Sequence, residues 1–358
     1  MFENLFKSKQ VSSPFSGKRV VGFDLGSTSI KVVELLEEDG VVTLTTYGEI
    51  QTGPYAKGVV GEKVQLGVKE EQEAVIDVLR ESSVTAKEAV YAVPLSSSFV
   101  TVVNFTVSEG EDVSGRVRAE ARKYIPIPIK EVTLDWAEIH RDGNSDELKK
   151  EVLLAAIQND SLRKMSELMQ HINIPDQPTE IECFSIIRGV LKDTDETTAI
   201  LDLGGSSSKL YITRLGLLER IHRVPVGGAQ ITTVLAKEKE SDFVTAEATK
   251  RSTHLSAEDT SLIFKVHSQQ LGRVLQEFRK VITQYEQSHN TRVGKVVITG
   301  GVSVYSNVKS IVSEVLEREV SIGSPFSKVA YPAFMEDVVN EIGPSFAVAL
   351  GAALRQFE

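Results

Sequence analysis

The sequence FDLGST, residues 23–28, places an acid, a glycine and two hydroxyl side chains directly after an apolar run. Asp24, Gly26, Ser27 and Thr28 all favour turns, so the stretch can be a simple hairpin corner. The same residues can also form a phosphate site. A glycine-containing turn offers backbone N–H groups to an anion, and a carboxylate at a strand end can hold a metal ion. Both interpretations are open from this stretch alone.

A second copy of the pattern lies about 180 residues further along the chain. VVGFDLGSTSIKVVEL and TAILDLGGSSSKLYIT share an apolar strand, an Asp-x-Gly turn and a second strand, so Asp202, Gly204, Gly205 and Ser206 repeat the first turn. One such turn carries little weight, but two in matching context indicate an internal duplication. Two related halves with such turns predict a bilobed protein with a central cleft.

Two opposed turns could clamp the phosphates of a nucleotide. Asp24 and Asp202 would hold Mg²⁺ through water, because Mg²⁺ gives up its water ligands reluctantly. Lys31, seven residues after Asp24, could neutralise a phosphate oxygen, or it is an ordinary solvated strand lysine. Gly300 and Gly301 would let the backbone approach a flat base closely, or they form an ordinary strand-to-helix turn. The sequence contains neither a GxxxxGK[ST] P-loop nor a GxGxxG fingerprint in a Rossmann setting.

The composition is that of a soluble globular protein with about two or three domain-sized units. Of the 358 residues, 41% are hydrophobic and 25% are charged. The formal net charge of −10 argues against a dedicated nucleic-acid binder, whose footprint would be a basic patch. The single cysteine, Cys183, excludes an intrachain disulfide, so we expect a reducing compartment such as the cytoplasm. No apolar run approaches the roughly 18 residues of a membrane span, and the six histidines are scattered rather than grouped as metal ligands.

The first half of the chain contains two segments with different patterns of predicted secondary structure. Residues 19–50 predict three strands, residues 70–82 an amphipathic helix and residues 88–94 a buried strand that ends at a proline. Residues 95–164 then give strand, helix, strand, strand and helix, with the polar loop RDGNSDELK between the last two strands. We interpret this compact α+β unit as an inserted subdomain.

From residue 197 the opening pattern of strand, acidic glycine turn, strand, turn and strand returns. Residues 228–290 are predicted to be helical, and KVVIT and PSFAVALGAALRQ predict a later strand and a closing helix of small residues. The expected units are an N-terminal tail (1–18), a first lobe (19–94 and 165–196), the insert (95–164), a second lobe (197–227 and 295–358) and a helical subdomain of the second lobe (228–294).

In this order the motifs resemble the superfamily of actin, sugar kinases and heat-shock chaperone ATPases. FDLGSTSIK resembles its first phosphate motif, ILDLGGSSSK its second, VVITGGV its adenosine motif and SFAVALGAALR its second connecting helix. Within it, the chain most resembles the PilM family of actin-like proteins of type IV pilus assembly, through VGFDLGSTSIKVVEL, EARKYIPIPIKEVTLDW, EVLLAAIQ, VPVGGAQIT and GSPFSKVAYP, over about residues 18–356. KYIPIPIKEVTLDW is the most specific motif, because it lies in the small insert shared with the division protein FtsA. The resemblance implies an α/β protein with a bilobed actin-like ATPase fold, two RNase H-like lobes and an inserted small α+β subdomain in the first lobe.

The resemblance also implies ATP and Mg²⁺ as ligands and assigns roles to the residues that match the family's motifs. Asp24 and Asp202 match the metal-side aspartates, and Glu182 matches the position near the attacking water, which makes it the candidate catalytic residue. The remaining matches are the first phosphate loop (Gly26, Ser27, Thr28, Lys31), the second (Gly204, Gly205, Ser206), a diglycine near the terminal phosphate (Gly227, Gly228), a pair that flanks the adenosine (Glu247, Lys250) and the adenine shelf (Gly300, Gly301, Val302).

The sequence departs from the family pattern in two places. Cys183 follows Glu182 where the family usually has a proline, and the second phosphate loop is unusually rich in serine. Both departures bear on the catalytic rate more than on nucleotide binding. Since family members hydrolyse ATP slowly, the resemblance implies a nucleotide-controlled assembly factor with weak or no ATPase activity rather than a metabolic enzyme.

A membrane partner follows from the same resemblance. A PilN-like protein with one membrane span would insert its cytoplasmic N-terminal segment between the first lobe and the insert, so the chain would be cytoplasmic and peripheral to the inner membrane. Pilus motor ATPases and a second copy of the chain are further partners that the resemblance allows. The machine served could make pili, secrete proteins or take up DNA. The bases of SGRVRAEARKYI could face the partner groove or the membrane, or form a plain solvated face.

Two other functions on the same fold stay open. A small-molecule kinase, for a sugar or acetate, needs a positioned base beside its acceptor hydroxyl, and only Glu182 is a candidate. An FtsA-like filament-forming division protein usually ends in an amphipathic membrane helix after a linker, whereas this sequence stops at LRQFE directly after the core.

Overall fold

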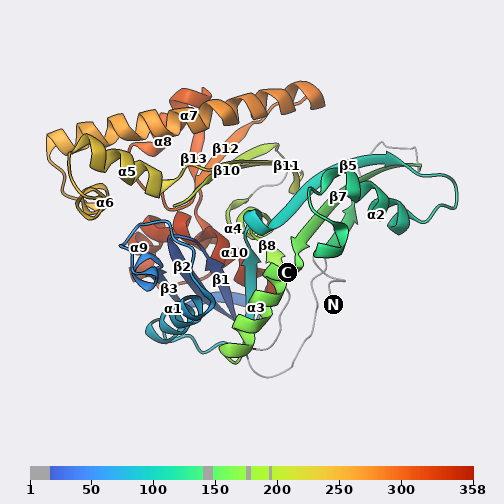
Figure 1. The fold of residues 1–358 in the computed structure, drawn as a ribbon, viewed down its shortest axis with the longest axis horizontal. Coiled ribbons are helices and arrows are strands. Elements are labelled where there is room, and N and C mark those ends of the chain that lie inside the picture. Colours follow the sequence, from blue (N-terminus) through green and yellow to red (C-terminus); the bar gives the residue numbers. More distant parts are fainter. Residues whose placement is uncertain (1–16, 140–147, 175–178, 193–195) are drawn as a thin grey trace.

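The structure is a computed structural model that describes residues 17–139, 148–174, 179–192 and 196–358. Two five-stranded sheets with their helices form two lobes, and a three-stranded sheet with one helix extends from them (Figure 1). Residues 1–16 of the predicted N-terminal tail and most of the predicted polar loop RDGNSDELK lie outside the described residues.

The first sheet has the strand order β3-β2-β1-β4-β8. Its first three strands form an antiparallel meander, and β1, β4 and β8 run parallel. The strands are β1 (Lys18–Leu25), β2 (Ser29–Glu38), β3 (Val41–Gln51), β4 (Glu88–Val93) and β8 (Thr179–Ile181).

The second sheet repeats this topology with the order β11-β10-β9-β12-β13 and the same directions of pairing. Its strands are β9 (Thr198–Leu203), β10 (Ser208–Arg214), β11 (Leu217–Val224), β12 (Lys295–Thr299) and β13 (Val320–Ile322). The matching order confirms the internal duplication that the two Asp-x-Gly stretches predict.

Helices cover both sheets. In the first lobe α1 (Val68–Glu81) buries Ala74, Val75 and Val78 against β1 and β2. In the second lobe the long helix α7 (Ala257–His289) runs across the sheet (Figure 1) and buries eleven side chains, among them Phe278. The remaining helices are α3 (Asn159–His171), α4 (Glu182–Val190), α5 (Gly228–Glu238), α6 (Phe243–Arg251), α8 (Val308–Leu316), α9 (Glu336–Ile342) and α10 (Ala347–Leu354). Within the described residues, no helix has both the length and the apolar character that crossing a membrane requires.

The insert is an antiparallel sheet in the order β5-β7-β6 with α2 against one face. Its elements are β5 (Ser98–Thr106), α2 (Val113–Tyr124), β6 (Val132–Glu138) and β7 (Lys149–Gln158), and α3 then returns to the first lobe. This confirms the predicted order of strand, helix, strand, strand and helix. A core of its own, which includes Val103, Val117, Ala121 and Leu154, holds the insert together.

Two helices, α4 and α10, connect the lobes through an unusually close crossing. A Cβ on Gly351 of α10 would lie 1.9 Å from the carbonyl oxygen of Ser185, and a Cβ on Gly189 of α4 would lie 2.6 Å from that of Ala347. The apolar cluster around α4 contains residues from both large sheets. Because backbone meets backbone, any side chain at these glycines forces the helices apart.

The short parallel strands β8 and β13 have three residues each and were not predicted. A three-residue segment is too short for a periodic pattern, so only pairing with β4 and β12 makes these segments strands.

We expect Gly351→Ala to lower the free energy of unfolding by about 3 kcal/mol, because its methyl group overlaps a backbone oxygen that cannot rotate away. Gly272→Ala on α7 is the matched control. Nothing lies within 4 Å of the added Cβ there, so this change should be neutral or add up to about 1 kcal/mol. Calorimetric unfolding of both variants checks the difference. Equal stability of the two variants would show that the α4–α10 crossing is looser than described.

Candidate functional site

The two Asp-x-Gly turns end equivalent strands of the two lobes. Asp24 lies opposite Lys31 in the β1–β2 register, and Asp202 lies opposite Lys209 in the β9–β10 register. Each turn therefore carries an acid and a lysine on neighbouring strands. Lys209 is a site residue that was not predicted from the sequence. The signal for it is that it follows Asp202 by the same seven positions that separate Lys31 from Asp24.

Both turns require glycine at the same place. A Cβ on Gly26 would lie 2.7 Å from the carbonyl oxygen of Ser29, and a Cβ on Gly204 would lie 3.0 Å from that of Ser207. Four backbone N–H groups of the turns donate to no other residue in the described part of the chain, namely those of Ser27, Thr28, Gly205 and Ser206. Such groups are available to an anion.

The turns meet across the two lobes. A Cβ on Gly205 would lie 2.2 Å from Oγ1 of Thr28. The Thr28 side chain of the first turn therefore packs directly against the backbone of Gly205 in the second turn. The structure thus brings the two predicted phosphate loops into contact, as a pair of opposed jaws requires.

Lys209 links three parts of the molecule. Its Nζ donates to Oδ2 of Asp202 at 3.0 Å and to Oε2 of Glu182, the first residue of α4, at 2.9 Å. The other carboxylate oxygen of Glu182 accepts the N–H of Leu95 at 2.7 Å. Asp202, Glu182 and Lys209 each have side chains less than 15% exposed, and each oxygen of the candidate catalytic carboxylate accepts one hydrogen bond.

Burial dominates the electrostatics of this cluster. Desolvation raises the pKa of Asp24 from 3.8 to about 6, against the opposing effect of Lys31. Burial also raises the pKa of Asp202, where Lys209 opposes it. Although burial favours the neutral form of Lys209, Asp202 and Glu182 raise its pKa, so it stays charged. The carboxylates of Asp24, Asp202 and Glu182 outnumber the ammonium groups of Lys31 and Lys209 that act on them, and a cation would relieve the difference.

Lys31 is neither solvated nor in direct contact with Asp24. Its side chain is 11% exposed, and its Nζ pairs with Oε1 of Glu49 on β3 at 3.2 Å and donates to Oγ of Ser29. A phosphate oxygen would have to compete with Glu49 for this lysine.

The start of α5 supports the second turn. The N–H groups of Gly228 and Ala229 donate to the carbonyl oxygens of Gly204 and Gly205, at 3.0 and 2.8 Å. A Cβ on Gly227 would lie 2.5 Å from the Gly204 oxygen. The predicted diglycine thus lies against the second loop and fixes its shape.

Glu247 and Lys250 form a buried ion pair rather than a solvated one. Nζ of Lys250 lies 2.6 Å from Oε2 of Glu247, and each side chain is 4% exposed. Lys250 also donates to the carbonyl oxygen of Gly228 at 3.1 Å and lies 6.0 Å from the ring centre of Tyr305. The predicted adenosine pair therefore adjoins the start of α5, and Tyr305 is a neighbour that the sequence analysis missed.

The turn after β12 lies directly against the second Asp-x-Gly turn. Gly300 has a φ of +86°, and its missing Cβ would lie 2.5 Å from Oδ1 of Asp202. The N–H of Val302 donates to the carbonyl oxygen of Leu203 at 2.9 Å, whereas the Cβ direction of Gly301 is open. The predicted adenine shelf thus packs against the end of the strand that carries Asp202.

A family model described as "Type IV pilus assembly protein PilM" matches residues 22–357. The chain belongs to the PilM family. Among solved structures, the chain is similar to a PilM-PilN type IV pilus biogenesis complex, with a TM-score of 0.80 and 22% identity over 95% of this chain and 98% of that one. The family is one of type IV pilus assembly.

Two further solved structures share the fold more distantly. The ethanolamine utilization protein EutJ from Carboxydothermus hydrogenoformans matches with a TM-score of 0.57 and 15% identity over 97% of this chain and 92% of that one. A nucleotide-free diol dehydratase-reactivating factor matches with a TM-score of 0.52 and 12% identity over 95% and 100%. With the PilM family match, they confirm the predicted bilobed actin-like ATPase fold.

Cys183, which stands where the PilM family usually has a proline, is a packing residue. Its side chain is fully buried in the apolar cluster shared by the two lobes. Burial raises the pKa of its thiol well above the ordinary value, which disfavours the reactive thiolate.

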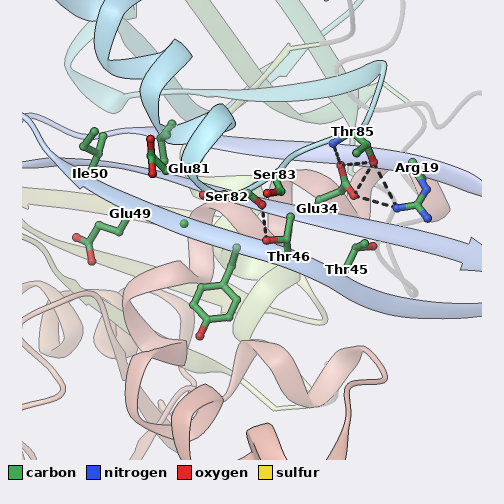
Figure 2. Close-up of a pocket in the computed structure, with 13 residues that line it drawn as sticks. Arg19, Glu34, Thr45, Thr46, Glu49, Ile50, Glu81, Ser82, Ser83 and Thr85 are labelled. Atoms are coloured by element: carbon green, nitrogen blue, oxygen red, sulfur yellow. Dashed lines mark hydrogen bonds and ion pairs between the residues drawn. The ribbon is translucent and has the colours of Figure 1, made fainter.

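An open groove of about 690 Å³ between β3 and the end of α1 contains none of the residues predicted for the nucleotide (Figure 2). Its one fully buried carboxylate, Glu34, accepts the N–H groups of Thr85 and Ala86, both at 2.6 Å, and pairs with Arg19 at 3.1 Å. These bonds tie the loop after α1 to the sheet, so the Glu34 charge is structural.

We expect Asp24→Asn to stabilise the nucleotide-free, metal-free protein at pH 8 by about 1 to 3 kcal/mol, because a carboxyl whose pKa rises from 3.8 to about 6 on folding is costly to ionise. The gain should be present above pH 6 and should disappear as the pH falls through 6 toward 4, where the wild-type carboxyl is protonated in the folded state. Denaturant unfolding at pH 4.5, 6 and 8 measures it. A gain that does not depend on pH would contradict this account.

Proposed function

We propose that this protein binds Mg²⁺-ATP between its two lobes and acts as a nucleotide-controlled component of the type IV pilus assembly platform. The observation that carries the proposal is the contact between the two turns, which brings their unengaged N–H groups close to the ends of the strands that carry Asp24 and Asp202. Membership of the PilM family supports the pilus role.

The cleft residues fit such a ligand by their chemistry. Within the described residues, no three His, Cys, Asp or Glu side chains are grouped as direct ligands of a metal ion. Two aspartates with raised pKa values at opposed turns suit a hydrated Mg²⁺, which keeps most of its waters and neutralises phosphate charge when bound. The turn N–H groups would hold phosphate oxygens, and Lys250, Glu247 and Val302 would lie beside the adenosine.

Slow or absent hydrolysis fits the position of Glu182. A general base needs an acceptor lone pair within hydrogen-bond reach of the proton that it takes. Both oxygens of Glu182 already accept one hydrogen bond each, from Lys209 and from Leu95, so an attacking water would have to share an oxygen with one of these donors.

The proposed partner is the cytoplasmic N-terminal segment of a PilN-like inner-membrane protein, which would hold this chain at the membrane surface. The similar solved structure is a complex of PilM with PilN. In the insert, β6 pairs with β7 alone among the strands that the structure describes. An extended peptide added along β6 would have to displace the hydrogen bond that the N–H of Trp136 donates to Oδ1 of Asp135 at 2.9 Å. Motor ATPases and a second copy of the chain stay proposed partners without a specific contact.

We expect a fluorescent ATP analogue to bind in the presence of Mg²⁺ and to lose about 100-fold or more in affinity in the double variant Asp24→Ala, Asp202→Ala, because charge-assisted contacts to metal and phosphate disappear. The control Asp160→Ala, Asp337→Ala removes the same charge at exposed positions. Titration by fluorescence anisotropy compares them. Unchanged affinity in the first variant, or no binding by the wild type, would refute the nucleotide site.

We expect a synthetic peptide of the neighbouring partner's cytoplasmic N-terminus to change the emission of Trp136, the only tryptophan, which lies half-buried on β6. A scrambled peptide of equal charge is the control, and calorimetry measures binding independently. Calorimetric binding without a change in emission would move the docking site away from the insert.

A further inference from the structure

The insert touches the rest of the molecule through an apolar face. Val100 of β5 and Ala155 and Ile157 of β7 pack into the cluster that contains Cys183 of α4 and Tyr211 of β10. This cluster draws on both lobes, so the insert rests on the hinge between them and not on the first lobe alone.

A hydrogen bond fixes the point where the chain enters the insert. Leu95 follows Pro94 at the end of β4 and begins a short 3₁₀ turn, η2 (Leu95–Ser97), that leads into β5. Its N–H donates to the buried carboxylate of Glu182 at 2.7 Å. Glu182 lies 87 residues later in the sequence, so this bond is a tertiary link and not part of a local turn.

The same carboxylate is tied to the second lobe. Lys209 donates to Glu182 at 2.9 Å and to Asp202 at 3.0 Å. Both carboxylates are buried, and the Lys209 side chain is 13% exposed. Three consecutive short hydrogen bonds therefore lead from the Asp-x-Gly turn of the second lobe, through the first residue of α4, to the first residue of the insert.

We propose that Glu182 is a positioning residue that couples occupancy of the cleft to the attachment of the insert. This inference rests on the proposed nucleotide site. Lys209 shares its charge between two carboxylates and turns toward phosphate when the cleft is filled. Glu182 follows Lys209, because a buried carboxylate is held more strongly by its cation than by a neutral N–H. The N–H of Leu95 is then released, and the entry to the insert loosens.

The coupling is reciprocal. A ligand that holds the insert in its attached position lowers the affinity for nucleotide. Nucleotide lowers the affinity for that ligand by the same factor. The buried link supplies the differential contact that such an effect requires.

Hydrogen–deuterium exchange of the full chain, with and without Mg²⁺ and the ATP analogue, tests the proposal. The readout is the amide of Leu95, which is separated from that of Val93 because Pro94 has none. In the wild type we expect nucleotide to speed this exchange roughly 10- to 100-fold, the effect of losing one hydrogen bond to a charged group.

Two variants separate coupling from simple support. Glu182→Gln keeps an oxygen for Leu95 but loses its charge pair with Lys209, so exchange should stay slow with or without nucleotide. Glu182→Ala loses both contacts, so exchange should be fast in both conditions. Glu138→Gln, which removes an ion pair with Lys150 inside the insert, is the control and should respond like the wild type.

Fluorescence titration of the same samples distinguishes the two levels of failure. Nucleotide binding with unchanged exchange at Leu95 overturns the coupling and leaves the nucleotide site intact. The coupling is also overturned if nucleotide speeds the exchange of the Leu95 amide by the wild-type factor in both Glu182 variants. A merely structural contact would change the exchange rate without nucleotide and leave that factor unchanged. Absence of binding overturns the nucleotide site, and the coupling with it.

Discussion

A single buried lysine holds together the part of this molecule where its three units meet. Lys209 lies between carboxylates from the second lobe and from the first connecting helix. Burying three charges is expensive, and it is sustained only because each charge keeps a close partner of opposite sign or a backbone donor. This arrangement links the start of α4 to the second Asp-x-Gly turn, and thereby the first connecting helix to the second lobe.

The hinge helices supply the complementary constraint. At the crossing of α4 with α10, glycines allow backbone to touch backbone, so the lobes cannot slide without a clash. With the helices fixed, Thr28 meets Gly205 across the cleft, and Gly300 meets Asp202 from the side. Each turn is ordinary by itself, and the packed helices behind the turns hold them in the arrangement that forms the proposed site.

The duplicated frame was extended differently in its two copies. The first lobe carries its insert between the fourth and fifth strands of its sheet, whereas the second places α5, α6 and α7 between the third and fourth. The helical extension brings Glu247 and Lys250 beside the cleft, and the sheet insert lies on the hinge. The helical extension therefore lies beside the proposed nucleotide site. The sheet insert lies where a movement of the hinge would change its contacts.

The sequence by itself determined the duplication, the two glycine turns and the order of elements in the insert, because these are local patterns in which strand periodicity and turn chemistry act over a few positions. The site residues were hypotheses drawn from the two turns and from the resemblance. The tertiary structure alone decided what those residues touch. Lys31 looked free to meet a phosphate, but it pairs with Glu49 on the next strand. Glu247 and Lys250, assigned to the adenosine by resemblance, form a buried ion pair. The partners of Glu182 come from positions 95 and 209, and β8 and β13 exist only through pairing with distant strands. Such contacts depend on how separate segments are brought together, and the energy that fixes them is gained only when the lobes, the hinge and the insert are packed at once.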